Sequence, residues 1–304
     1  MARSRSSSPA RASSTTSVKA PSVFTATALG RLPVPVKDAA AAQLADGSLV
    51  LLGGIDLSGA STDAIVLVRG RDVVRRGSLP SPQHDAQAAA IGRFLYVFGG
   101  GQFSSYDHIL RYDPTSGAVT QVGTLPVPAS DVAVTSLGDT AYVVGGYDGA
   151  RALDTIIAWR PGAPPRVAGH VPSGVRYAAV AALDGRLIIA GGTESGGATD
   201  LILSFDPRSG AVSPIGRLPT PLTHATAVVF GGRVLLIGGR RTATDERTSA
   251  ILSIDPASGQ TQTVGHLAQP ISDAMAGASG GQVILAGGET GTGPLSSLLG
   301  LRAG

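Results

Sequence analysis

Leu95-Tyr96-Val97-Phe98-Gly99-Gly100, four apolar residues closed by two glycines, decides the fold because the chain repeats this pattern six times. The first glycines of the six pairs stand at positions 53, 99, 145, 191, 238 and 287, so the spacings are 46, 46, 46, 47 and 49 residues. A period of this size is typical of repeat proteins. Four apolar residues between turn signals predict a strand buried on both faces, and the glycines end it where backbones approach closely.

Each repeat predicts four strands arranged around the glycine pair. A strand of small residues, such as 86–91, precedes the apolar strand, and a third strand, such as 109–112, follows a variable polar loop. An Asp-Pro-x-Ser-Gly turn at 113–117, 206–210 and 255–259 then leads into the fourth strand. Because the chain has no helical period, we predict an all-β fold: one six-bladed β-propeller of four-stranded antiparallel blades over residues 23–304.

The two ends of the repeat region predict how the ring closes. Residues 24–33 match a fourth strand but precede the first repeat, and residues 297–301 match a third strand with nothing after them to complete the blade. We therefore expect a strand at about 24–30 to complete the C-terminal blade. Residues 1–22 are rich in Ser, Arg and Ala and hold few large apolar residues, so we expect a disordered tail.

The tail also bears on where the protein resides. It resembles the linker that follows an export signal or lipid anchor, so we expect an extracytoplasmic protein, in the envelope or secreted, if such a signal lies upstream. If the sequence is complete as written, the cytoplasm is expected instead. The chain has no Cys and no apolar run long enough to be a transmembrane helix.

Charge argues against nucleic acid as a partner. The chain has 24 basic and 21 acidic residues, but residues 1–22 hold four of the basic ones and no acid. The body therefore has 20 basic and 21 acidic residues, a charge near −1, and lacks the excess of basic residues typical of nucleic-acid-binding domains. We expect no cofactor and no metal, because no metal, phosphate-loop or nucleophile motif occurs. We also expect a monomer.

We expect binding on one face of the ring, which we call the loop face. It carries the variable loops after the glycine pairs and the connections into each first strand, whereas the turns on the opposite face are short and uniform. A polar column marks the start of each first strand, nearest the central channel. With its neighbours and polar loop positions it gives the predicted binding residues: Asp38, His84, Asp85, Asp131, Tyr147, Arg176, Tyr177, Glu194, His224, Arg240, Arg241, Asp273 and Glu289.

Purely structural interpretations of the polar columns stand beside the functional one. The four recurring aspartates could fix loops, and His224 could be a hydrogen-bonded rim histidine rather than a general base. A second column precedes the third strands, and we expect its side chains to accept hydrogen bonds from loop amides: Asp63, Asp107, Asp154, Asp200, Ser249 and Ser296. We expect His170 and His266, on the outermost strands, to face solvent.

The repeat resembles the kelch family in three features. These are the glycine pair, the Asp-Pro-x-Ser-Gly turn, and an aromatic residue near the end of the third strand at Tyr112, Trp159 and Phe205. The resemblance covers residues 23–304 and is closest to a divergent, GC-rich bacterial branch. It departs where kelch units usually carry a Trp beyond the turn, because this chain has Val119, Val212 and Gln262 there.

Together these observations predict a non-catalytic binding scaffold that recognises an unidentified protein or glycan through the loop face. The alternative is a small sugar-processing enzyme, because six-bladed kelch propellers include a sugar mutarotase. In that case His84, Arg176 and His224, with the rim aspartates, would be the catalytic residues. Copper-radical chemistry of the galactose oxidase kind is excluded because it needs a Cys crosslinked to Tyr, and the chain has no Cys.

Overall fold

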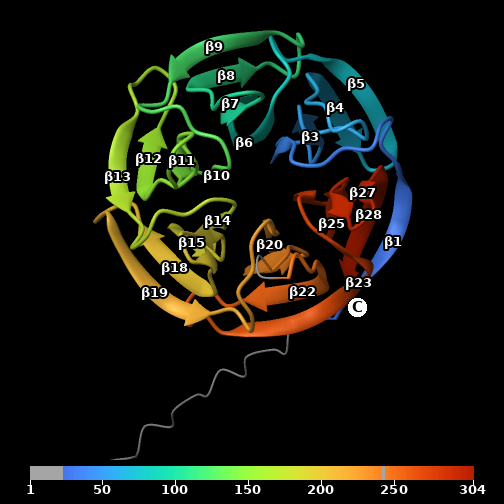
Figure 1. The fold of residues 1–304 in the computed structure, drawn as a ribbon. Coiled ribbons are helices and arrows are strands. Elements are labelled where there is room, and N and C mark those ends of the chain that lie inside the picture. Colours follow the sequence, from blue (N-terminus) through green and yellow to red (C-terminus); the bar gives the residue numbers. More distant parts are fainter. Residues whose placement is uncertain (1–22, 242–243) are drawn as a thin grey trace, which may run out of the picture.

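The computed structural model describes residues 23–241 and 244–304 and forms a ring of six four-stranded blades around a central channel (Figure 1). Blade 1 consists of β2 (Ala40–Gln43), β3 (Leu49–Leu52), β4 (Ala64–Arg69) and β5 (Asp72–Ser78). Blade 2 consists of β6 (His84–Ile91), β7 (Phe94–Gly101), β8 (His108–Tyr112) and β9 (Val119–Thr124). Blade 3 consists of β10 (Ala133–Leu137), β11 (Thr140–Val144), β12 (Thr155–Trp159) and β13 (Arg166–His170). The expectation of a disordered tail at 1–22 lies outside the described residues.

Blades 4 to 6 repeat this order and add two small hairpins. Blade 4 consists of β14 (Ala179–Leu183), β15 (Arg186–Ala190), β18 (Leu201–Asp206) and β19 (Ala211–Arg217). Blade 5 consists of β20 (Thr226–Phe230), β21 (Arg233–Ile237), β22 (Thr248–Ile254) and β23 (Thr261–Ile271). Blade 6 consists of β24 (Met275–Ser279), β25 (Gln282–Ala286), β28 (Ser297–Ala303) and β1 (Phe24–Arg31). The hairpins are β16 (Thr193–Glu194) with β17 (Gly197–Ala198), and β26 (Glu289–Thr290) with β27 (Gly293–Pro294).

The N-terminal strand closes the ring, as the order of elements predicts. β1 pairs antiparallel with β28, from Phe24 opposite Ala303 to Arg31 opposite Ser297, and so completes blade 6. Phe24 also forms a parallel bridge to Gly265 of β23, so the sheets of blades 5 and 6 are joined at the seam. In Figure 1 the blue β1 lies outside the red strands β25 and β28.

The core lies between blades, where the apolar second strands are buried on both faces. The aromatic side chains of Tyr112, Phe205 and Trp159 are almost fully buried in these layers. The glycine pair answers a steric need: Gly99 has a φ of 60°, and a Cβ there would lie 2.1 Å from the carbonyl oxygen of Ala129. The predicted close approach at the end of the second strand is therefore confirmed.

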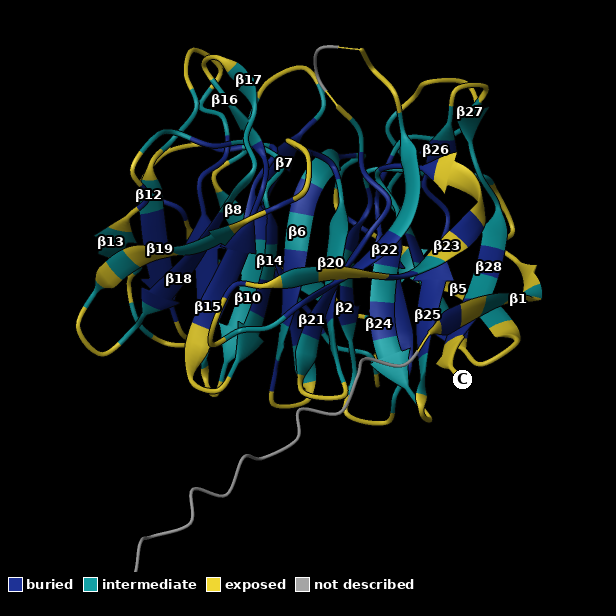
Figure 2. Ribbon diagram, turned by 90° about the horizontal axis from the view of Figure 1, so that it is seen from below, coloured by how far each residue is buried: buried dark blue, intermediate teal, exposed yellow. Residues whose placement is uncertain are grey.

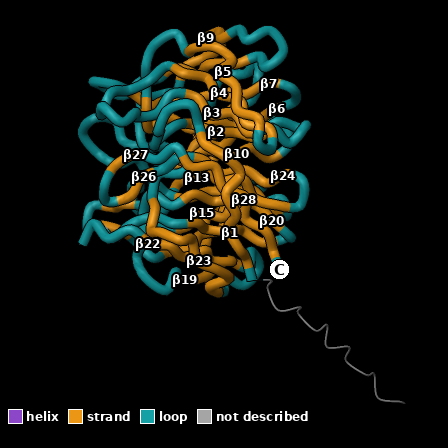
Figure 3. Tube along the Cα trace, turned by 90° about the vertical axis from the view of Figure 1, so that its right-hand side faces the viewer, coloured by secondary structure: helices purple, strands orange, loops and turns teal. Residues whose placement is uncertain are grey.

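Loops gather on the two faces of the ring, and the strands fill the layer between them (Figure 3). Both small hairpins, β16–β17 and β26–β27, project from the loop face (Figure 2). On the opposite face the predicted Asp-Pro-x-Ser-Gly turn forms: the Asp113 carboxylate accepts the Thr115 amide at 2.9 Å, and the Gly117 amide donates to the Asp113 carbonyl at 2.8 Å. The described residues contain no helix that could span a membrane.

The residues of the second polar column bind the loop amides through different atoms from those we predicted. It is the backbone carbonyl, not the side chain, that accepts a loop amide, as between Asp63 and the Leu79 amide at 2.7 Å. The carboxylates instead face the fourth strand, where Arg75 pairs with Asp63 at 3.2 Å. His170, exposed as predicted, lies 3.3 Å from the carboxylate of Asp154. Because the backbone carbonyls already accept the loop amides, the side chains are available to pair with the fourth strand.

Candidate functional site

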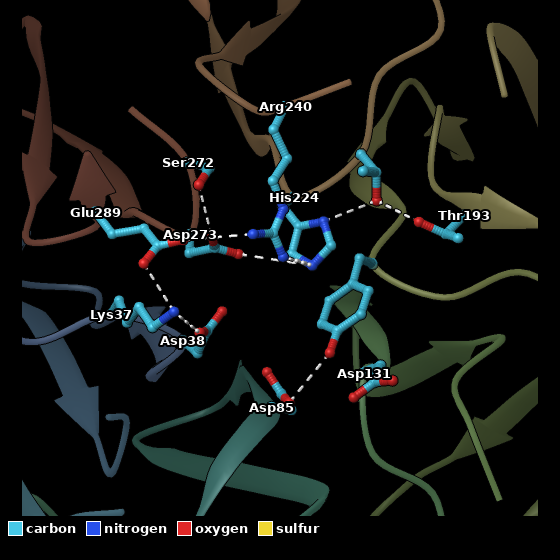
Figure 4. A network of polar contacts seen from close by, with 12 residues as sticks. Lys37, Asp38, Asp85, Asp131, Thr193, His224, Arg240, Ser272, Asp273 and Glu289 are labelled. Carbon is cyan, nitrogen blue, oxygen red and sulfur yellow. Dashed lines mark hydrogen bonds and ion pairs between the residues drawn. The ribbon is translucent and has the colours of Figure 1, made fainter. Parts of the chain in front are cut away.

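The first polar column forms a closed ring of backbone hydrogen bonds at the channel mouth. Each member donates its amide to the carbonyl of the member one blade earlier, and the first donates to the last, over 2.8 to 3.2 Å. All six have a positive φ between 51° and 59°, a conformation that is uncommon outside glycine. The members, which define the channel mouth, are Asp38, Asp85, Asp131, Tyr177, His224 and Asp273. Figure 4 labels the four aspartates and His224 with their polar neighbours.

This ring explains why aspartate recurs at the mouth. Aspartate, asparagine and histidine tolerate the left-handed region better than other side chains, and the chain has no asparagine. The recurrence is therefore architectural, as the structural interpretation held, but the backbone conformation causes it and not loop capping by the carboxylates. Tyr177 has no such preference, and its presence requires another reason.

The four carboxyl groups of the ring are between 2% and 13% exposed and interact in two pairs, Asp38 with Asp273 and Asp85 with Asp131. Burial, with the charge of its partner Asp273, raises the pKa of Asp38 well above its usual value. Burial and the charge of Asp131 raise the pKa of Asp85 in the same way. Each pair can thus hold a proton that an exposed aspartate would have lost at neutral pH. The mouth contains both proton donors and proton acceptors.

Arg176 compensates the negative charge on one side of the mouth. Its Nε and a terminal nitrogen both bind the carboxylate of Asp131. Its guanidinium lies 4.2 Å from the ring centroid of Tyr147, in a cation–π contact on the loop side. The hydroxyl of Tyr177 reaches across the channel and donates to the Asp85 carboxyl at 3.2 Å. These contacts connect blades 2, 3 and 4 through side chains alone.

His224 is held neutral, with both ring nitrogens engaged. Arg240 donates to Nε2 at 2.8 Å, so the proton resides on Nδ1, which lies 3.0 Å from the hydroxyl of Thr223. Burial, with the charges of Arg240 and Arg176, lowers the pKa of His224 to about 2. Its ring stacks on Tyr177 with centroids 3.7 Å apart. The general-base role we considered would require Arg240 to leave Nε2.

A cluster of cations surrounds Glu289 at the edge of the mouth. Glu289 accepts from Lys37 at 2.8 Å, from Arg247, and from Arg240 at 3.4 Å. Burial by itself would raise the pKa of Glu289, but the hydrogen bonds and charges of Lys37 and Arg247 lower it below its usual value. The carboxylate therefore stays ionised although its side chain is only 8% exposed.

The structure brings most of the predicted residues together but not all of them. His84 belongs to the mouth, because its Nε2 lies 3.6 Å from Asp85 and its Nδ1 lies 2.8 Å from the hydroxyl of Ser61. Arg241 instead pairs with Glu246 in an exposed loop, and Glu194 lies in the β16–β17 hairpin away from the ring pairs. Neither makes a described contact with the mouth.

Sequence reasoning missed two residues of the cluster, Lys37 and Arg247. Lys37 was visible as a neighbour of Asp38, but nothing in the sequence paired it with Glu289, which lies 252 positions away. Arg247 lies in a loop of irregular length, so no repeat position marks it. Its side chain is largely buried, and Nε has no partner among the described residues.

The hollow at the mouth is small and polar. It has a volume of about 70 Å³, is lined by the ring side chains, and leads into a channel of about 100 Å³ lined mainly by alanine and valine. There is room for hydroxyl groups of a ligand but not for a whole sugar ring. No cluster of three acids or histidines among the described residues has the geometry of a metal site.

Comparisons with known proteins agree on the fold. Residues 128–162 match the Kelch motif. The solved structure of YjhT superimposes on 88% of this chain and 95% of its own with a TM-score of 0.77, at 16% sequence identity. No curated protein matches the chain. The repeat and the ring of blades together make this chain a β-propeller that carries a Kelch motif in its third blade. An identity of 16% carries the fold alone and leaves function to be argued from the mouth.

Proposed function

We propose that the chain is a binding module that holds a polyhydroxylated ligand, a glycan, on its loop face with one edge in the mouth. The observation that carries this proposal is the concentration of buried ionisable side chains there. The backbone ring needs only residues that tolerate a positive φ, and glycine would serve. Burying Asp85, His224 and Glu289, and partly burying Arg176, costs desolvation energy that the fold does not require.

The chemistry of the mouth favours hydroxyl groups over a charged ligand. A sugar hydroxyl both donates and accepts, and the mouth offers both partners: carboxylates that accept and the guanidinium of Arg176 and the hydroxyl of Tyr177 that donate. The acids are also largely compensated by Lys37, Arg176, Arg240 and Arg247, so a neutral ligand leaves no charge unpaired.

The part of the ligand outside the hollow would rest on the adjoining loops. The stacked side chains of Arg176 and Tyr147 provide a flat surface on the loop side of blades 3 and 4. Flat aromatic and guanidinium surfaces suit the apolar face of a sugar ring, while the hydroxyls point toward the carboxyl pairs. The shape of the site therefore suits one sugar residue of a larger glycan.

A sugar mutarotase is the second candidate, and the two carboxyl pairs favour it. Ring opening needs an acid that protonates the ring oxygen and a base that takes the proton of the anomeric hydroxyl. Asp85 with a raised pKa would supply the acid, and Asp131, whose carboxylate is bound by Arg176, would supply the base. In this candidate Arg176 orients the sugar, and His84 and His224 shape the site.

The two candidates separate by binding and turnover measured on the same variants. We would screen the protein on an array of oligosaccharides, measure the affinity of each hit by calorimetry, and follow the anomeric exchange of reducing sugars by NMR. Arg176→Leu should weaken binding at least tenfold, because it removes donors and the stacking surface. The control Arg75→Leu makes the same substitution at a more exposed ion pair on the outer strand, with Asp63, and should leave affinity unchanged.

Each outcome bears on the proposal. Binding without exchange supports the module, whereas exchange that stops in Asp85→Asn while binding persists supports the enzyme. If no oligosaccharide binds, or if Arg176→Leu binds as tightly as the wild type, a glycan site at the mouth is refuted. The search then moves to protein partners of the loop face.

A further inference from the structure

A second cavity lies beside blade 3 and shares no lining residue with the mouth. Its volume is about 390 Å³, and its walls are mainly apolar, with Leu125, Val143, Leu153 and Ile157 among them. Ligand pockets in proteins typically enclose roughly 300–1,000 Å³, so this space is large enough for a small molecule. It opens on the loop face, between the connection from β9 to β10 and the loop that follows β11.

A departure from the repeat creates this cavity. Ala129 lies two residues before the ring member Asp131, and the equivalent positions of the other blades hold larger buried side chains: Val36, Gln83, Val175, Leu222 and Ile271. Gly174 on the opposite wall is a second exception, because proline occupies that position in the other five connections: Pro35, Pro82, Pro128, Pro221 and Pro270. Ala129 leaves the space unfilled, whereas Gly174 marks a close backbone approach, because a Cβ there would lie 2.3 Å from the carbonyl oxygen of Ala152.

An unfilled apolar cavity lowers stability, and at this position four of the other repeats avoid that cost with valine, leucine or isoleucine, while blade 2 fills it with Gln83. Val127 and Val167 are 43% and 50% exposed and belong to the lining, so apolar surface reaches the opening. The sequence therefore keeps open, in one blade of six, a space that a single methyl-bearing substitution would reduce.

Two charged side chains stand at this opening, and only one is available to a ligand. The Asp154 carboxylate is directed to the outer strand, where it lies 3.3 Å from His170. Arg151 is 81% exposed and only loosely paired, because its nearest approach to an acid is 3.6 Å, from Nε to Asp148. The terminal nitrogens of such an exposed guanidinium have the geometry that binds a carboxylate with two hydrogen bonds.

We propose that this cavity binds a small carboxylic acid with an apolar aromatic or branched body. The body fills the space left by Ala129, and the carboxylate pairs with Arg151. The inference is independent of the glycan site, because the two hollows share no side chain. It gives the propeller a second ligand on the same face.

Phenylacetate and its neutral counterpart 2-phenylethanol test the proposal by calorimetry on the full chain. Phenylacetate should bind the wild type at least tenfold more tightly than the alcohol does. Arg151→Gln should reduce phenylacetate binding to the level of the alcohol, because it removes the charged partner and leaves the walls intact.

Filling the cavity should abolish binding and stabilise the fold together. Ala129→Ile introduces the side chain that blade 5 carries at Ile271, so we expect no detectable binding of either probe and a Tm raised by about 2–4 °C. Val36→Ile is the matched control: it adds a methyl group at the equivalent position of another blade and should leave phenylacetate binding unchanged.

The results that overturn the proposal are equally defined. No binding of either probe to the wild type refutes a ligand site, and a raised Tm in Ala129→Ile would then mark the space as a packing defect. Equal affinity for acid and alcohol, or full binding in Arg151→Gln, refutes the carboxylic acid class. Unchanged binding in a folded Ala129→Ile places the ligand elsewhere.

Discussion

Phe24→Ala tests whether the N-terminal strand holds the propeller closed. Phe24 is 7% exposed at the seam between blades 5 and 6, and its ring meets that of Phe230 edge-on with centroids 5.4 Å apart. Removing a buried Phe side chain typically costs about 3–5 kcal/mol, and an aromatic pair contributes up to roughly 1.5 kcal/mol within that range. The seam has no covalent link, so this loss falls on the contact that joins the chain ends. We expect the free energy of unfolding to fall by at least ~3 kcal/mol.

Urea unfolding followed by circular dichroism measures this change. Thr25→Ala is the control, because Thr25 lies next in the same strand with its side chain exposed, and it should change stability by no more than ~0.5 kcal/mol. Shortening the chain to begin at residue 34 should go further and abolish the single cooperative transition. A loss below about 1 kcal/mol in Phe24→Ala would refute the closure argument, because the chain ends would then be held by something other than β1.

Three further changes probe the mouth and the glycine pairs. The pKa of His224 is lowered to about 2, so between pH 6.5 and 2 the unfolded chain binds a proton that the folded chain rejects. Stability is lost as pH falls, and His224→Asn should lose about 2 kcal/mol less than the wild type between pH 7 and 5 by urea unfolding. The raised pKa of Asp85 has the opposite effect on stability. The stability that the protonated Asp85 contributes is lost as pH rises above the pKa of an aspartate in the unfolded chain, near 3.8. In the same assay, Asp85→Asn should therefore become more stable relative to the wild type as pH rises from 4 to 7. If the difference in unfolding free energy between the two proteins is the same at both pH values, the buried carboxyl pair is contradicted. Gly99→Ala should cost more than ~2 kcal/mol, because a Cβ would lie 2.1 Å from the Ala129 carbonyl; thermal unfolding measures this, and a near-neutral result would remove the steric role of the glycine pair.

The sequence alone could predict the architecture because its signals are local and repeated. A glycine after four apolar residues, as at Gly99, predicts both a buried strand and a close approach of another backbone segment at the end of that strand. The position of residues 24–33 ahead of the first repeat was enough to place β1 in blade 6. Strand ends differed by a few residues, because side-chain signals do not fix where pairing stops.

The mouth was only partly predictable. The column of Asp38 and its equivalents was visible, and the absence of asparagine was a clue to a left-handed backbone. The closed ring of hydrogen bonds was not, because it depends on six blades meeting around one axis. Lys37 and Arg247 were missed because their common partner Glu289 comes from the last blade, and no spacing in the sequence encodes such a contact.

The ring separates the needs of the fold from those of the site. Since every amide of the ring is satisfied by a backbone carbonyl, the side chains there are free to vary without loss of the propeller. Selection for the fold alone would favour residues that accept a positive φ cheaply at all six positions. Tyr177 departs from that rule, yet its hydroxyl bonds across the channel to Asp85 and its ring stacks on His224. The strained position is therefore explained by what the side chains do together at the mouth, which supports a ligand there.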